Sequence, residues 1–196
     1  MQTISQSYAV SLYSPTGQRK YVNAAERVRF IAAALECPRP KLRTLCLVLA
    51  MTGCRISEAL DLFSASIEAS EGSIALRSLK KRKKAIVIRQ LPVPASLIEL
   101  LQAVHDLSTP GERLWPWSRS RAWQLVKAVM AEASIGPGLY ATPKGLRHGF
   151  GVHAIRSGIP LNLVQRWMGH ASMTTTAIYL QVIGAEEREI AERMWQ

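Results

Sequence analysis

Two apolar segments that flank a run of basic residues constrain the fold more than any other feature of the 196-residue sequence. Residues 73–80 (SIALRSLK) alternate apolar and polar side chains, and residues 85–93 (AIVIRQLPV) are rich in β-branched side chains. Both patterns are typical of β-strands, and every residue between them is basic. We therefore expect one antiparallel β-hairpin with a basic tip.

The remainder of the chain has helical periodicity that glycine and proline interrupt. Asn23 and Glu26 have the spacing of an N-cap and its capping-box partner, so a helix is expected from there to about Glu36. The other expected helices cover about residues 41–51, 56–62, 94–105, 118–133, 144–156, 160–169 and 172–182, with a final amphipathic segment over 186–195. The fold class is therefore α+β, mainly helical with a small antiparallel β-sheet or hairpin.

The excess of basic residues indicates a polyanionic partner. The chain has 25 Lys and Arg against 14 Asp and Glu, a formal net charge of +11. Nucleic acid is the first expectation and an anionic membrane surface the second. No apolar run approaches the ~20 residues that span a bilayer. The N-terminal residues lack the apolar region of a secretory signal.

Cysteine and histidine patterns exclude several classes of site. Three cysteines without C-x-x-C spacing argue against a disulfide framework or a zinc ribbon, and they fit a reducing cytoplasm. The four histidines form no H-E-x-x-H motif, and no P-loop sequence G-x-x-x-x-G-K-[ST] occurs. We therefore expect neither a metal site nor a cofactor.

Two clusters place cations where a phosphate could bind. Arg55 lies at the start of a predicted helix, where free backbone N–H groups would add to its guanidinium, and Glu58 is spaced to hold it. Lys144 and Arg147 are three residues apart and would project from one helical face. Ordinary surface charge is the alternative for both clusters, as a solvated turn is for the basic run Lys80–Lys84.

His170 and Tyr179 are further candidates. His170 follows the helix stop at Gly169, so it can point from a loop into a cleft. A structural role in the core is the alternative for both side chains. Trp115, Trp117 and Trp123 lie among arginines and could stack on bases, although packing is the favoured interpretation.

Taken in order, these motifs resemble the tyrosine recombinases, also called the phage integrase family. The segment TGCRISE at 52–58 matches the family's TGxRxxE box, and LRHGF at 146–150 matches LRHxF. Residues 163–170 resemble the family's helix that ends in LGH, and TTTAIY at 174–179 matches TTxxY. Lys80 lies at the end of the first predicted strand, where the family carries its catalytic lysine. The resemblance covers about residues 23 to 183.

The resemblance implies a DNA breaking and rejoining enzyme that works through a 3′-phosphotyrosyl intermediate without metal or ATP. The implied catalytic residues are Arg55, Lys80, Lys144, Arg147, His170 and Tyr179. Glu58 is implied to support Arg55. The implied DNA-binding residues are Lys81, Arg82, Lys83, Lys84, His148 and Arg166. The sequence leaves open which lysine of the hairpin is the general acid.

The resemblance also implies partners, location and domain organisation. Double-stranded DNA and a homo-oligomer on DNA, a tetramer, are expected, with a second recombinase or accessory protein left open and no membrane partner. The expected location is cytoplasmic and nucleoid-associated, in DNA recombination or integration by a mobile element. Residues 1–22 are expected to form an arm, 23–183 the catalytic domain and 184–196 a helical tail that docks on a neighbouring subunit. The family's usual N-terminal core-binding domain is expected to be missing.

One residue departs from the family pattern. The second box usually opens with histidine, as HxxR, and this sequence has Lys144 there. A lysine can donate to a phosphate, but near neutral pH it is a poorer acceptor for a tyrosine proton. Two other functions stay open from sequence: a DNA-binding regulator without catalysis and a type IB topoisomerase-like enzyme. A basic RNA-associated protein is a third and weaker alternative.

Overall fold

The computed structural model describes residues 11–79, 86–108, 111–181, 188, 191–192 and 194–195. Its helices are α1 (Ala24–Glu36), α2 (Pro40–Thr52), α3 (Ile56–Ala59), α4 (Ala95–Val104), α5 (Arg119–Glu132), α6 (Pro143–Arg156), α7 (Leu161–Met168) and α8 (Met173–Ala177), with 3-10 turns η1 (Ser64–Ser66) and η2 (Ile178–Gln181). Its strands are β1 (Ile67–Glu68), β2 (Ser73–Leu79) and β3 (Ile86–Pro92). This mainly helical fold with a small antiparallel sheet confirms the predicted fold class.

The sheet contains the predicted strand pair and one strand that the sequence did not predict. β2 and β3 pair antiparallel from Ser73 opposite Pro92 to Leu79 opposite Ile86. β1 pairs with the other edge of β2, which gives the order β1-β2-β3. A strand as short as β1 has no detectable alternation. The basic tip, Lys80–Lys84, lies outside the described residues.

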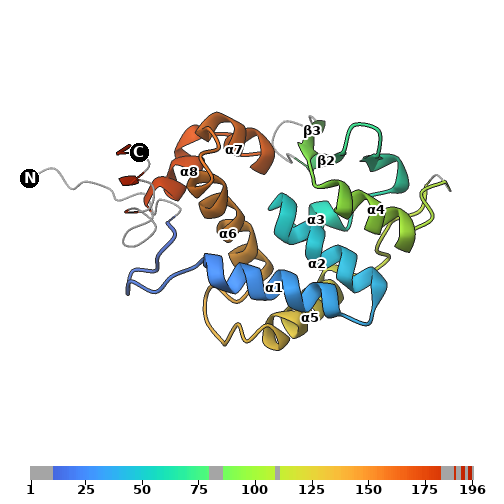
Figure 1. Ribbon diagram of the computed structural model, residues 1–196, viewed down its shortest axis with the longest axis horizontal. Helices are drawn as coiled ribbons and strands as arrows, with labels where there is room; N and C mark the ends of the chain where they lie inside the picture. The colour runs from blue at the N-terminus through green and yellow to red at the C-terminus, as the bar shows by residue number, and fades with distance from the viewer. Residues whose placement is uncertain are drawn as a thin grey trace, which may run out of the picture.

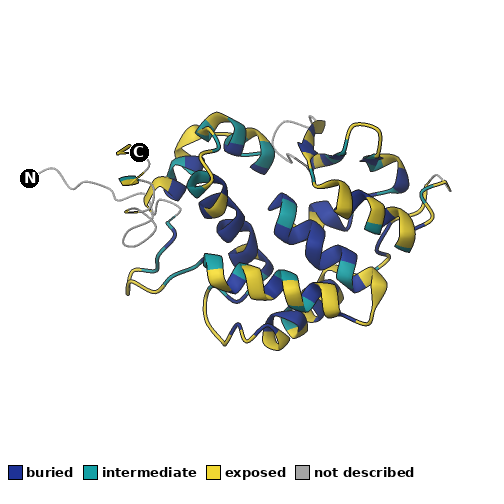
Figure 2. Ribbon diagram, in the orientation of Figure 1, coloured by how far each residue is buried: buried dark blue, intermediate teal, exposed yellow. Residues whose placement is uncertain are grey.

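Helix α2 forms the centre of the core. Most of its side chains are buried, and they pack against α1, α4 and α6. Figure 1 places the sheet and α4 at one end of the molecule and α6, α7 and α8 at the other, with α1 and α5 side by side along one edge. Buried residues line the inward faces of α2 and α6 in Figure 2. The buried residues form two clusters, one around α2 and one between α6, α7 and η2, and α6 contributes to both.

The segment before α1 packs on α6. Leu12, Tyr21 and Val22 are buried, and the backbone N–H of Val22 donates to the carbonyl of Gly145 at 3.1 Å. Gly149 permits this contact, because a Cβ there would lie 2.4 Å from the carbonyl oxygen of Val22. The part of the predicted arm that the structure describes is therefore packed against the domain.

Local signals placed most helix ends correctly. The predicted capping box is present, with Asn23 and Glu26 each accepting from the other's backbone N–H at 2.8–2.9 Å. Two predicted helices are shorter than expected. The first ends at Ala59 instead of Leu62, and the second ends at Ala177 and continues as the 3-10 turn η2. Three consecutive β-branched threonines weaken this second helix. Half of the predicted segment 186–195 lies outside the described residues.

Gly149→Ala is expected to lower the free energy of unfolding by about 1–3 kcal/mol, because the new methyl group must displace backbone. Urea unfolding followed by circular dichroism measures the change. Gly136→Ala is the matched control, since a Cβ there meets nothing within 4 Å. That control should change stability by no more than about 1 kcal/mol. Equal stability of Gly149→Ala and the wild type would contradict the close approach of the N-terminal segment.

Candidate active site

A cavity of about 590 Å³ lies among α3, α5, α6, α8 and η2. Six residues that the family resemblance implied for catalysis or DNA binding line it: Arg55, Lys144, Arg147, His148, His170 and Tyr179. These residues are separated by up to 124 positions in the chain, from 55 to 179. The structure therefore brings together cations, two histidines and a tyrosine in one place.

Arg55 is held at the cavity by a carboxylate from its own helix. It is the N-cap residue of α3, which follows the left-handed Gly53 at the end of α2. Glu58 accepts from the Arg55 backbone N–H at 2.8 Å and from its Nη1 at 2.8 Å. The Arg55 side chain remains 48 % exposed, whereas that of Glu58 is 5 % exposed. The predicted support of Arg55 by Glu58 is thus present, and the guanidinium stays accessible.

Arg147 is a buried cation held by carbonyl oxygens. Its Nη1 donates to Gly53 at 2.7 Å, and its Nη2 donates to Met168 at 2.5 Å. None of its hydrogen bonds within the described part of the chain goes to a carboxylate. Burial, together with the positive charge of Arg55, lowers the pKa of Arg147 to about 10, so the group stays charged near neutral pH. A buried cation without a direct ion pair favours an anionic ligand.

Tyr179 is buried in the wall of the cavity. Its side chain is 1 % exposed, and its hydroxyl lies 3.3 Å from Nδ1 of His148. The ring of His170 stacks on it at 6.1 Å. Gly151 makes room for the phenol, since a Cβ there would come within 2.5 Å of the ring. Burial raises the pKa of Tyr179 to about 12, against the opposing effect of Arg147 and Arg55, so the hydroxyl is protonated near neutral pH.

Both histidines at the cavity are neutral near pH 7. Burial and the positive charges of Lys144 and Arg147 lower the pKa of His148 to about 3. Burial and the charges of Arg147 and Arg55 lower the pKa of His170 to about 4. Nδ1 of His170 lies 3.0 Å from the Thr176 hydroxyl, which fixes the ring. The positive charge of the cavity therefore comes from its arginines and from the exposed Lys144.

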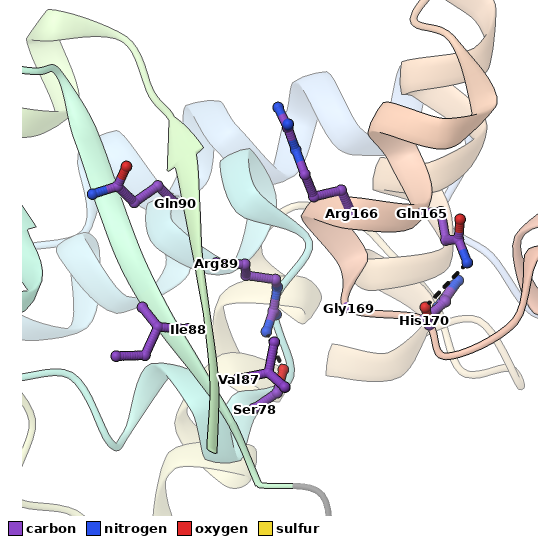
Figure 3. A pocket seen from close by; sticks show the side chains of 9 residues that line it. All are labelled: Ser78, Val87, Ile88, Arg89, Gln90, Gln165, Arg166, Gly169 and His170. Atoms are coloured by element: carbon purple, nitrogen blue, oxygen red, sulfur yellow. Dashed lines mark hydrogen bonds between the residues drawn. The ribbon is translucent and has the colours of Figure 1, made fainter. Parts of the chain in front are cut away.

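Arg89 is a buried residue that the sequence analysis did not select. It projects from β3 toward α7, as Figure 3 shows, and its Nη2 pairs with Oε2 of Glu58 at 2.8 Å. Burial alone would raise the pKa of the Glu58 carboxyl, but hydrogen bonds and charge from Arg89 and Arg55 outweigh burial and lower it. The one available signal was strand alternation, which puts Arg89 on the same face as the buried Leu91.

The other predicted residues lie in different surroundings. Arg166 is exposed on α7 and lines a second cavity of about 580 Å³ between β3 and α7, which His170 shares (Figure 3). Trp115 is fully buried, which confirms packing for that residue, and its Nε1 donates to the carbonyl of Lys41 at 2.7 Å. Trp123 is 43 % exposed and lines the first cavity. Lys80–Lys84 fall outside the described residues.

The described residues contain neither a metal-binding cluster nor a membrane-spanning helix. No group of three or more His, Cys, Asp and Glu side chains there could hold a metal ion. No described helix combines the length and the apolar character that crossing a membrane needs.

Comparisons with known proteins find related sequences over most of the chain. A family model described as the phage integrase family matches residues 20–185. The tyrosine recombinase XerA of Pyrococcus furiosus is 30% identical over 168 residues, which cover 80% of this chain and 56% of the relative. The chain thus spans little more than half the length of that relative.

Solved structures show the same fold. A crystal structure of XerA recombinase matches with a TM-score of 0.76 at 25% identity, over 90% of this chain and 65% of the other. A crystal structure of the XerH site-specific recombinase bound to its difH substrate matches with a TM-score of 0.73 at 20% identity, over 94% of this chain and 60% of the other.

Stability is expected to fall as the solution is acidified from pH 7 to pH 5. All four histidines have a lowered pKa in the folded protein, so in this window the unfolded chain binds protons that the folded chain does not. Each buried histidine can therefore remove at most about 1.4 kcal/mol of stability per pH unit. Glu26 and Glu58 also have a lowered pKa, and the stability that they contribute is lost mainly below pH 5.

Urea unfolding at pH 7, 6 and 5 measures the effect. His105 lies outside the cavity and has a pKa lowered by burial to about 4, so His105→Gln should give a shallower dependence on pH than the wild type. The same free energy of unfolding at pH 7 and pH 5 would show that the histidines are not buried as neutral groups.

Proposed function

The chain belongs to the phage integrase family, the tyrosine recombinases, and on that premise we propose that it breaks and rejoins DNA through a covalent 3′-phosphotyrosyl intermediate. The observation that carries the proposal is the convergence of Arg55, Arg147 and Tyr179 on one cavity. One arginine is accessible and the other is buried without a direct ion pair among the described residues. That arrangement suits a single phosphate diester.

The arginines bind and polarise the phosphate in this proposal. Arg55 and Arg147 donate to the two non-bridging oxygens, and their charges stabilise the negative charge of the transition state. His170 adds a hydrogen bond from its neutral ring, and Lys144 assists from the rim of the cavity. The guanidinium groups are held before DNA arrives, so little reorganisation is needed when the phosphate binds.

The bond changes are a transesterification. The Tyr179 hydroxyl oxygen attacks phosphorus, the bond to the 5′ oxygen breaks, and that oxygen takes a proton from Lys80 or another lysine of the hairpin. Nδ1 of His148 lies 3.3 Å from the Tyr179 hydroxyl, and in the proposal it accepts the phenolic proton as the O–P bond forms, when the anionic phosphate offsets the positive charges that lower the pKa of His148 in the free protein. Attack by the 5′ hydroxyl of another strand reverses these steps. The bond energy is conserved, so ATP is not required.

Tyr179 must be presented to the phosphate before it reacts. Its ring is almost wholly buried in the free protein, and its hydroxyl is directed at His148. The residue sits on η2, a 3-10 turn of four residues that can shift without unfolding a long helix. We expect DNA binding to move η2 toward the opening of the cavity.

The proposal extends to partners and location. Double-stranded DNA is the substrate, and a homo-oligomer on DNA, a tetramer, performs strand exchange, with residues 184–196 docking on a neighbouring subunit. The DNA complex of the structurally similar XerH supports a DNA partner. A partner recombinase or accessory protein could supply further DNA contacts. Work on chromosomal or mobile-element DNA implies a cytoplasmic, nucleoid-associated location.

Tyr179→Phe is expected to abolish covalent adducts and to leave salt-sensitive DNA binding within about threefold of the wild type, because only the nucleophilic oxygen is lost. The assay incubates the protein with a pool of nicked duplexes that carry randomised arms. Denaturing gels then show protein that stays attached to DNA. Tyr13→Phe is the matched control, since Tyr13 lies outside the cavity and should keep the adduct.

Adducts that persist in Tyr179→Phe would disprove the assignment of the nucleophile. Specific binding by the wild type without any adduct would favour a non-catalytic regulator. Relaxation of a supercoiled plasmid by a monomer, without exchange of partners, would favour the topoisomerase-like function.

A further inference from the structure

We propose that Arg89 is a positioning residue that sets the orientation of Arg55 and of the His170 loop. The proposal rests on the proposed function, in which Arg55 binds the scissile phosphate. Arg89 itself is 5 % exposed and does not line the cavity that holds Tyr179. It lines the second cavity beside His170, but its side chain is buried by its hydrogen-bond partners, so in this proposal it acts through the residues that it contacts.

One guanidinium group joins three separate elements. From β3, Nη2 of Arg89 donates to Glu58 on α3 at 2.8 Å, Nη1 donates to the Ser78 hydroxyl on β2 at 2.6 Å, and Nε donates to the carbonyl of Trp167 on α7 at 2.6 Å. Figure 3 shows the side chain lying between the sheet and α7. Only a planar group with several fixed donors can satisfy three acceptors in these directions, which a lysine cannot do.

The contact with Glu58 determines how much charge Arg55 can offer. The Glu58 carboxylate is 5 % exposed, so it needs a close positive partner to remain ionised. Arg89 supplies a buried partner whose side chain is 4 % exposed. Because Arg89 neutralises this carboxylate, the charge of the accessible Arg55 remains available for a phosphate. Without Arg89, Glu58 would either take up a proton or draw the Arg55 guanidinium inward.

The contact with Trp167 fixes the start of the His170 loop. The carbonyls of Trp167 and Met168 are adjacent at the end of α7, and they accept from Arg89 and Arg147 respectively. Gly169 follows in the left-handed conformation, and a Cβ there would lie 3.0 Å from Nη1 of Arg89. The backbone that leads to His170 thus rests directly on the Arg89 guanidinium. The hairpin, Arg55 and His170 are therefore set by one side chain.

The test compares two substrates that differ in the charge of the scissile group. A nicked duplex recovered in the adduct assay is made with either the natural phosphodiester or a neutral methylphosphonate at the scissile position. A neutral group has little need of the Arg55 cation. Single-turnover adduct formation is measured at saturating DNA for Arg89→Lys, Arg89→Met, Arg55→Ala and the wild type.

Arg89→Lys is expected to slow adduct formation on the phosphodiester by about 100-fold, as a misplacement of catalytic groups by about 1 Å does. On the methylphosphonate its rate should lie within about threefold of the wild type, and Arg55→Ala should give the same pattern. Ser78→Ala replaces Arg89→Met if that variant does not fold, because it removes only one contact of Arg89. It should slow adduct formation on the phosphodiester by about 10-fold and leave the rate on the methylphosphonate close to that of the wild type. Arg77→Met, an exposed residue on β2, is the matched control and should react at the wild-type rate.

Two results would overturn the proposed role of Arg89, and a third would overturn the proposed function instead. Equal slowing of Arg89→Lys on both substrates would mean that Arg89 only stabilises the fold, and it would overturn the proposal. A wild-type rate for Arg89→Lys on the phosphodiester would overturn it as well. Absence of any adduct from the wild-type protein would instead be a failure of the proposed function, which separates the two outcomes.

Discussion

The carboxylate of Glu58 is shared between two guanidinium groups, and much of the cavity depends on this sharing. Arg55 pairs with its Oε1 and Arg89 with its Oε2, each at 2.8 Å, and the Arg55 side chain is half-exposed whereas that of Arg89 is buried. The two guanidinium groups and the carboxylate together carry one net positive charge, and Arg55 of this group lines the cavity. The group also joins β3 of the sheet to α3 through the ion pair of Arg89 with Glu58. A single acidic side chain thus orders a site that is otherwise rich in mutually repelling cations.

Helix ends provide the second support for buried positive charge. Arg147 donates to Gly53 at the end of α2 and to Met168 at the end of α7, where unpaired carbonyl groups carry partial negative charge. Both helices end at a glycine in the left-handed conformation, Gly53 with φ 60° and Gly169 with φ 63°. The same glycines therefore stop the helices and turn their terminal carbonyls toward one arginine. The carbonyl groups at these two helix ends thereby take the place of a carboxylate partner, which would compete with a phosphate for Arg147.

Sequence reasoning succeeded where a signal was local and failed where it depended on tertiary contacts. The Asn23 cap, the Gly53 stop and the Arg55–Glu58 pair each lie within a few residues of their partners, so spacing alone predicted them. The role of Arg89 was not predicted because its three partners, at positions 58, 78 and 167, are distant from it in the sequence. Strand β1 and the 3-10 turn η2 were also missed, since two and four residues are too few for a periodic pattern.

The absence of a side chain at Gly151 leaves the space in which the Tyr179 ring is enclosed when no DNA is bound. A phenol that is enclosed and protonated cannot attack stray phosphate esters or be modified by electrophiles in solution. Under the proposed function, the free protein would therefore be unreactive, and Tyr179 would react only where contacts with DNA move its side chain out of this enclosed position. Under the same proposal, complete complexes would be favoured, because a partially bound subunit lacks the binding free energy that moving Tyr179 requires.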